Sequence, residues 1–141
     1  MKYVAVVLLC LAGTAGAITN PDAPDLVAAF HERMAPYAQR IRDGQTTLAM
    51  DQASVAMAEA LDRELNTAYG RLMARLEPAQ QSALRTAQRR WLKYRDAEFA
   101  FLNKTFSRES HGSAVVLTVG SARNALVQAR VEALWRRLQQ L

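Results

Sequence analysis

Apolar side chains recur every three or four positions through most of the chain, the spacing of one face of an α-helix. The clearest case lies in residues 48–76, where apolar positions step by four, four, three, four and four residues. These positions are Met57, Leu61, Leu65, Ala68, Leu72 and Leu76. Similar stripes predict helices over about residues 24–42, 79–106 and 114–140. The pattern therefore predicts an all-α fold.

Capping residues and helix breakers mark the ends of the first predicted helix. Asp22 or Asp25 can cap its beginning, because an aspartate side chain accepts the free N–H groups of a first turn. Pro36 lacks a backbone donor and is expected to kink this helix or break it in two. Gly44 is expected to end it.

The later boundaries predict antiparallel neighbours. Thr46 or Thr47 can cap the second helix, and Pro78 suits the first turn of the third. Residues 107–113 form a polar loop, in which Gly112 permits a tight turn and Ser113 can cap the last helix. Short links join long helices, so we expect an antiparallel helical bundle of three long helices plus a kinked N-terminal helix.

One stretch of the third predicted helix combines large aromatic and polar side chains. Trp91, Leu92 and Arg95 share one side of it, with Gln88 one turn earlier. An arginine near a core needs a polar partner, so we expect this stretch to determine how the neighbouring helices pack. The expected partly buried polar network comprises Asn66, Gln88, Arg95, Asp96 and Arg130.

The beginning of the chain is typical of a secretory signal. Residues 1–17 contain a basic start, a short apolar run and small residues suited to cleavage after about Ala17. Cys10 lies inside the apolar run without the small residue that usually precedes a lipidated cysteine, so a lipoprotein is not expected. We expect a periplasmic protein whose single domain spans residues 18–141, with no disulfide and no transmembrane segment.

Charge is distributed unevenly along the chain. Residues 18–84 carry six Lys or Arg against nine Asp or Glu, whereas residues 85–141 carry eleven against four. Export and the lack of a base-reading motif argue against nucleic acid as the partner of the basic half. An anionic envelope surface is the alternative partner. The basic residues expected to meet it are Arg85, Arg89, Arg90, Lys93, Arg136 and Arg137.

The usual catalytic patterns are missing from the sequence. His31 and His111 are far apart and have no cysteine ligand nearby, so neither a metal site nor a cofactor is predicted. Neighbouring carboxylates on the predicted helices are two residues apart and point to different sides. We therefore do not expect an enzyme.

Several short motifs occur together in a characteristic order. They are Glu64-Leu65-Asn66-x-x-Tyr69, Gln88-x-x-Trp91-Leu92-x-Tyr94-Arg95-Asp96, Gly112-Ser113 and Arg130-x-x-x-Leu134. With these motifs, the chain resembles the lysozyme inhibitor LprI, N-terminal domain family over roughly residues 50–138. The family comprises small exported helical proteins, and its name implies inhibition of lysozyme. Relatives usually carry cysteines at positions that are Ala53, Phe99 and Ala122 here.

The resemblance makes a protein-binding inhibitor the leading hypothesis. Its target would be a lysozyme-like wall hydrolase or an antibacterial toxin, the second implying an immunity role. Trp, Tyr and Arg are enriched at interface hot spots, and a polar loop can enter a partner's cleft. The candidate partner-binding residues are Trp91, Tyr94, Arg108, Glu109 and His111. The alternative is that the aromatic and polar residues only fix how the helices align.

Overall fold

The computed structural model describes residues 24–141, so the predicted signal peptide and Asp22 lie outside the described residues. The described part is helical and contains no strand, which confirms the all-α prediction. Its elements are α1 (Leu26–Asp43), α2 (Thr47–Met73), α3 (Pro78–Thr105), α4 (Arg108–His111) and α5 (Val115–Gln139). The loop expected at residues 107–113 thus contains a short helix.

The ends of α1 follow from its flanking residues. The Asp25 carboxylate accepts the N–H groups of Val27 and Ala28, which would otherwise lack partners. Gly44 follows the last residue of α1, as predicted. Pro36 lies inside one continuous helix, so of the two expected outcomes, a kink or a break, the break does not occur. The side chain of Pro36 is exposed.

The other helix ends are set by caps of different kinds. Thr46 Oγ1 accepts the N–H of Ala49 at 3.1 Å and so caps α2. Pro78 is the first residue of α3, as predicted. The prediction for Ser113 is wrong, because Ala114 precedes α5 and gives no side-chain cap. The chain reaches α5 through the turn after α4 instead, with the Val115 N–H donating to the Gly112 carbonyl at 3.3 Å.

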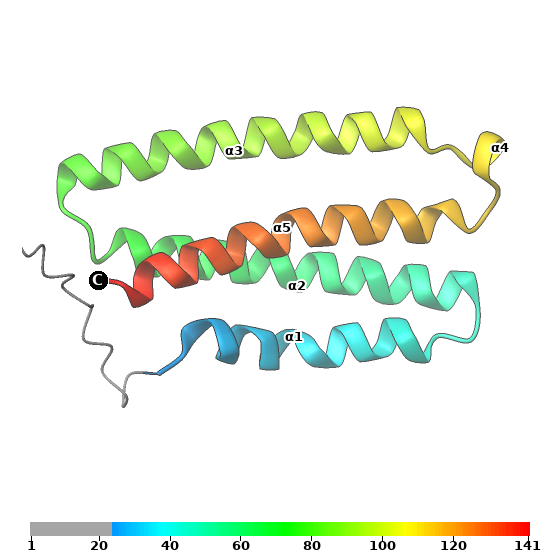
Figure 1. The fold of residues 1–141 in the computed structure, drawn as a ribbon, viewed down its shortest axis with the longest axis horizontal. Coiled ribbons are helices and arrows are strands. Elements are labelled where there is room, and N and C mark those ends of the chain that lie inside the picture. Colours follow the sequence, from blue (N-terminus) through cyan, green and yellow to red (C-terminus); the bar gives the residue numbers. More distant parts are fainter. Residues whose placement is uncertain (1–23) are drawn as a thin grey trace, which may run out of the picture.

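Long helices that follow one another in the sequence run antiparallel, so α2 and α5 run in the same direction (Figure 1). The α2 and α5 helices share the largest interface, and α1 packs mainly on α2. Figure 1 shows α3 along the far side of α5 from α1, with α4 at the corner where the chain turns back. The central pair α2 and α5 therefore carries most of the core.

The core is largely aliphatic but contains one large aromatic ring at its centre. Trp135 is 1% exposed, and the guanidinium groups of Arg33 and Arg71 lie 5.8 and 5.5 Å from its ring centroid. The other side chains that are less than 2% exposed and large are Phe30, Leu61, Val131 and Leu134. Contacts from α1, α2 and α5 thus converge on the C-terminal half of α5.

The α2 and α5 helices approach closely near the beginning of each. A Cβ atom at Gly120 would lie 2.8 Å from Ser54 Oγ, so no larger residue fits there without a shift. The buried Asn124 amide donates to both the Ser54 carbonyl and its Oγ, at 3.0 and 3.1 Å. A small residue and a satisfied amide therefore fix the spacing of this pair.

The α3 helix is much less buried than α2 and α5. Of its 28 residues, only Leu84 and Gln88 are buried, and the helix rests mainly on α5. Trp91 and Arg95 are half-buried. The expectation that residues 88–96 determine the packing of the other helices is therefore wrong, because the core forms between α1, α2 and α5.

Acid should weaken the contact between α1 and α2. The Arg33 guanidinium donates to both Glu64 oxygens at 2.6 and 2.9 Å, and this contact holds the pKa of Glu64 below its usual value of about 4.5. Because the folded-state pKa is depressed, the stabilisation is complete above about pH 4.5 and is lost as pH falls through the folded value. Arg33 is 47% exposed, so we expect a contribution of only about 0.5–1 kcal/mol.

The test compares wild type with Glu64→Gln by thermal unfolding at several pH values. The difference in Tm between the two should be largest near pH 7 and should shrink below about pH 4.5. A difference that stayed constant down to pH 3 would contradict an ion-pair origin.

Candidate functional site

The contact between α3 and α5 is a ladder of alternating arginine and aromatic side chains. Arg130 from α5 and Arg95 from α3 lie 5.7 and 5.8 Å from the ring centroid of Trp91. Arg95 and Arg123 lie 5.9 and 5.0 Å from the ring of Phe99. Each such cation–π contact contributes about 0.5–2 kcal/mol, depending on its exposure. We call these five residues the arginine ladder.

Amide side chains, and no carboxylates, bind the two α5 arginines of the ladder. Arg130 donates through Nε and Nη2 to Gln88 Oε1 at 3.0 and 2.9 Å. Arg123 donates through Nη2 to Asn103 Oδ1, while its buried Nε has no acceptor among residues 24–141. Burial and the nearby Arg137 lower the pKa of Arg130. The α3–α5 contact thus holds positive charge that the described carboxylates do not neutralise.

The five residues predicted to form one polar network fall into three places. Gln88 and Arg130 bind each other, as described above. Arg95 donates to the neighbouring Asp96, at 2.9 Å from Nε and 2.7 Å from Nη2, and Asp96 is 64% exposed. Asn66 is exposed on α2 and makes no side-chain hydrogen bond to another residue in the described range. Only Trp91, between Arg95 and Arg130, links the first two groups.

A groove lies between α2 and α3, and both amide partners of the ladder, Gln88 and Asn103, belong to its lining. Its two halves have volumes of about 500 and 520 Å³, and Asp62 and Arg95 line both. Valines of α5 and Phe99 line the first half together with charged residues, among them Asp51, Arg108 and Arg123. The second half is basic, because three arginines and a single carboxylate line it. Its remaining lining residues are Leu65, Asn66, Tyr69, Arg85, Gln88, Arg89 and Leu92.

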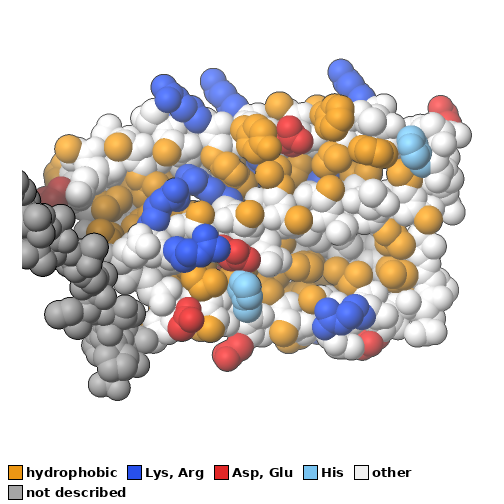
Figure 2. All heavy atoms as spheres, viewed as in Figure 1, with side chains coloured by type: hydrophobic (Ala, Val, Ile, Leu, Met, Phe, Trp, Pro, Cys, Tyr) orange, Lys and Arg blue, Asp and Glu red, His pale blue; other side chains and the backbone are white. Residues whose placement is uncertain are grey.

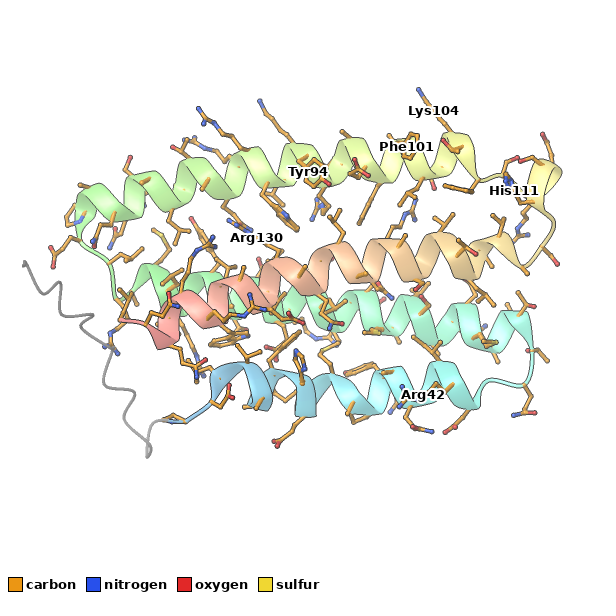
Figure 3. The ribbon with its side chains drawn as sticks, in the orientation of Figure 1. Arg42, Tyr94, Phe101, Lys104, His111 and Arg130 are labelled. Carbon is orange, nitrogen blue, oxygen red and sulfur yellow. The ribbon has the colours of Figure 1, made fainter. Side chains whose placement is uncertain are left out.

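The α4 helix forms an exposed corner at one end of the molecule, next to the first half of the groove (Figure 3). Arg108, Glu109 and His111 are all exposed there. The corner is held locally, since Ser107 Oγ accepts the Ser110 N–H at 3.3 Å and Ser110 Oγ lies 2.7 Å from His111 Nδ1.

A ring contact and a glycine conformation also shape this corner. The rings of Phe106 and His111 are 5.4 Å apart, and Phe106 is half-buried. Gly112 has φ +78°, a conformation that other residues rarely adopt, so it permits the turn out of α4. The three candidate side chains therefore project from an ordered turn.

The two aromatic residues predicted to bind a partner lie in different surroundings. Trp91 is half-buried within the arginine ladder, whereas Tyr94 is 52% exposed on α3 (Figure 3). Phe101, further along α3, is 56% exposed. Lys and Arg side chains also project along the outer edge of α3 in Figure 2. Trp91 and Tyr94 therefore do not form one continuous patch with the exposed residues of α4.

The structure adds residues that the sequence pattern did not single out. Arg123 and Asn103 join α5 to α3, and Asp62 lies midway along the groove. Arg123 precedes Arg130 by seven residues, a spacing of two helical turns that places both on one face of α5. That spacing was the available signal for Arg123. Asp62 had none, because its position depends on where α3 lies.

Two kinds of site are missing from the described part of the chain. Residues 24–141 contain no group of three His, Cys, Asp or Glu side chains placed to hold a metal ion. Within the same range, each helix is too short or too polar to cross a bilayer.

Comparison with known proteins gives one match. The family model described as "Lysozyme inhibitor LprI" matches residues 39–134, which include α2, α3, α4 and most of α5. No curated protein and no solved structure matches the chain. The matched range contains both the groove and the α4 corner.

Proposed function

The chain belongs to the lysozyme inhibitor LprI family, and from this we propose that it is an exported, non-enzymatic protein that binds and inhibits its target. The target is a lysozyme-like wall hydrolase or an antibacterial toxin, and in the second case the protein acts as an immunity protein. The family match over residues 39–134 is the observation that carries this proposal. The inhibitor is the domain of residues 18–141, acting in the periplasm after removal of residues 1–17.

The α4 corner is the element best suited to enter an active-site cleft. Glycoside hydrolases that cut glycan strands hold a pair of carboxyl groups within a cleft. Arg108 and His111 lie on an exposed turn, and a hydrogen bond to Ser110 already holds the His111 ring, so they can meet such carboxyl groups without rearrangement of the turn. Glu109 would then contact basic residues at the rim of the cleft. Trp91 and Tyr94 belong to a second contact along α3.

Charge narrows the choice of target. The protein carries a net charge of +5, and residues 85–141 hold most of the excess. Like charges slow association and lower affinity, so a strongly basic lysozyme is a poor target. A hydrolase or toxin with an acidic surface around its cleft is the better one.

Alanine substitutions at α4 should weaken inhibition. We expect Arg108→Ala and His111→Ala each to raise the inhibition constant about tenfold, because each removes a hydrogen bond to a carboxylate at the centre of the interface. The measurement is the loss of turbidity of a cell-wall suspension, with a panel of wall hydrolases and increasing amounts of the protein. The matched control is Arg75→Ala, an exposed arginine beyond the end of α2 at the opposite end of the molecule.

The same assay with increasing salt tests the alternative, a structural protein that binds an anionic envelope surface. That function is favoured by the exposed basic residues along α3. Attraction to an anionic surface weakens steeply with added salt, whereas a packed one-to-one complex persists. If the protein slows no hydrolase, the inhibitor proposal is wrong. If Arg75→Ala weakens inhibition as strongly as Arg108→Ala, the assignment of α4 to the contact is wrong.

A further inference from the structure

The two halves of the groove between α2 and α3 meet at Asp62 and Arg95, which line both. On α2 the lining residues of the groove run from Asp51 to Tyr69, and on α3 they run from Arg85 to Asn103. Each span covers nineteen residues, and its eighteen steps of 1.5 Å correspond to about 27 Å. Because α2 and α3 are antiparallel, Asp62 and Arg95 face each other near the middle. They nevertheless form no ion pair, and each lines both halves.

The basic half of the groove has the chemistry of a carboxylate site. Arg85, Arg89 and Arg95 line it from α3, against the single carboxylate of Asp62. Arg85 and Arg89 form no ion pair with any residue in the described range and are four residues apart on one face of α3. Guanidinium groups bind carboxylates through paired hydrogen bonds, and the amide of Asn66 supplies a further donor across the groove.

The other half of the groove has an apolar base, although charged residues, among them Asp51, Arg108 and Arg123, also line it. Val115, Val119 and Val127 of α5 form its base, and Val55 of α2, which is 53% exposed, stands at its edge. Arg123, whose buried Nε lacks an acceptor among residues 24–141, also lines it. This half ends at α4, because Phe106 and Arg108 belong to its lining.

We propose that this groove binds an acidic, extended peptide segment of the protein partner. Carboxylates of the segment lie against Arg85, Arg89 and Arg95, and its apolar side chains lie on the valines near α4. About 27 Å corresponds to eight or nine residues of extended chain at roughly 3.3 Å each. A partner docked at α4 reaches the groove without a gap, since Arg108 belongs to both. The inference deepens the proposed function by naming the chemistry of the partner's segment.

The experiment measures peptide binding to the full chain without any hydrolase. The probe is a fluorescent nine-residue peptide, blocked at both ends, with three glutamates, three alanines and three valines, together with the same sequence reversed. Its affinity is measured by fluorescence anisotropy at 150 mM salt. Two twin probes replace either the glutamates by glutamines or the valines by serines.

Matched variants separate the groove from the rest of the basic surface. Arg85→Gln with Arg89→Gln should weaken binding about tenfold, because charge-assisted hydrogen bonds are lost. Arg90→Gln with Lys104→Gln removes the same charge from exposed α3 positions outside the groove, and should weaken it less than about threefold. Asp62→Asn should strengthen binding a few-fold by removing a like charge, while Glu32→Gln on α1 should not.

These experiments test peptide binding in the groove independently of inhibition. All four substitutions in the two double variants are at exposed positions, so folding should survive them. Equal weakening by both double variants, or no response to Asp62→Asn, would overturn the inference, as would failure of both wild-type peptides to bind. Equal binding of the valine and serine probes would overturn the assignment of the first half, the one next to α4. A chain that inhibits a hydrolase but binds neither peptide keeps the proposed function and loses this one.

Discussion

Replacing Trp135 with alanine is expected to lower the free energy of unfolding by about 3–5 kcal/mol, the range for removing a large buried aromatic ring. Trp135 is 1% exposed and lies among core residues of three helices. Its loss would leave a cavity that α1, α2 and α5 cannot all close at once. It would also remove the ring on which Arg33 and Arg71 rest. The measurement is urea unfolding at pH 7, followed by far-ultraviolet circular dichroism.

The control for this prediction is the same substitution at the other tryptophan. Trp91 is half-buried and contacts α5 through Arg130, so Trp91→Ala should cost less than about 2 kcal/mol. Equal costs at the two positions would mean that α3 belongs to the core as fully as α5 does. A cost below about 1 kcal/mol at Trp135 would contradict the burial on which the prediction rests.

The contrast between the tryptophans shows what the sequence pattern can predict. Apolar spacing identified every long helix to within a few residues, because each buries one stripe. It did not identify which helix is central. Trp91 stands in the richest local motif but lies on the least buried long helix. Trp135 lies next to Leu134, and both are buried because α5 has neighbours on more than one side. Adjacent positions of a helix can share one buried face, so Trp135 was compatible with the apolar stripe of α5 but was not singled out by it.

The candidate site was predictable only where it depends on one pair of helices. Gln88 and Arg130 were expected together only as members of a five-residue network, and the structure pairs these two. The groove did not follow, because it exists only where α3 stands away from α2. Local propensity gave no sign of that separation. The helical form of residues 108–111 was missed because one turn of four residues leaves no periodic signal.

Backbone amides of α3 are expected to exchange with solvent at least about tenfold faster than those of α2 and α5, which corresponds to about 1.4 kcal/mol or more of local stability. The α2 helix buries seven of its 27 residues and α5 seven of its 25, against two of 28 in α3. What holds α3 is the arginine ladder and its two amide contacts, in which each cation–π contact contributes about 2 kcal/mol at most. Hydrogen–deuterium exchange followed by mass spectrometry at pH 7 makes the comparison within one sample.

Substitution at the arginine ladder shows whether the lower stability is confined to α3. Trp91→Ala should accelerate exchange in α3 and leave α2 nearly unchanged, whereas Trp135→Ala should accelerate all the long helices together. If α3 is as protected as α2 in wild type, it is a full member of the core, and the groove beside it is a fixed channel. If α3 opens on its own, a segment bound in the groove has to hold it closed. The acidic peptide should then slow exchange in α3 most strongly near Arg85 and Arg89, because those residues would bind its carboxylates.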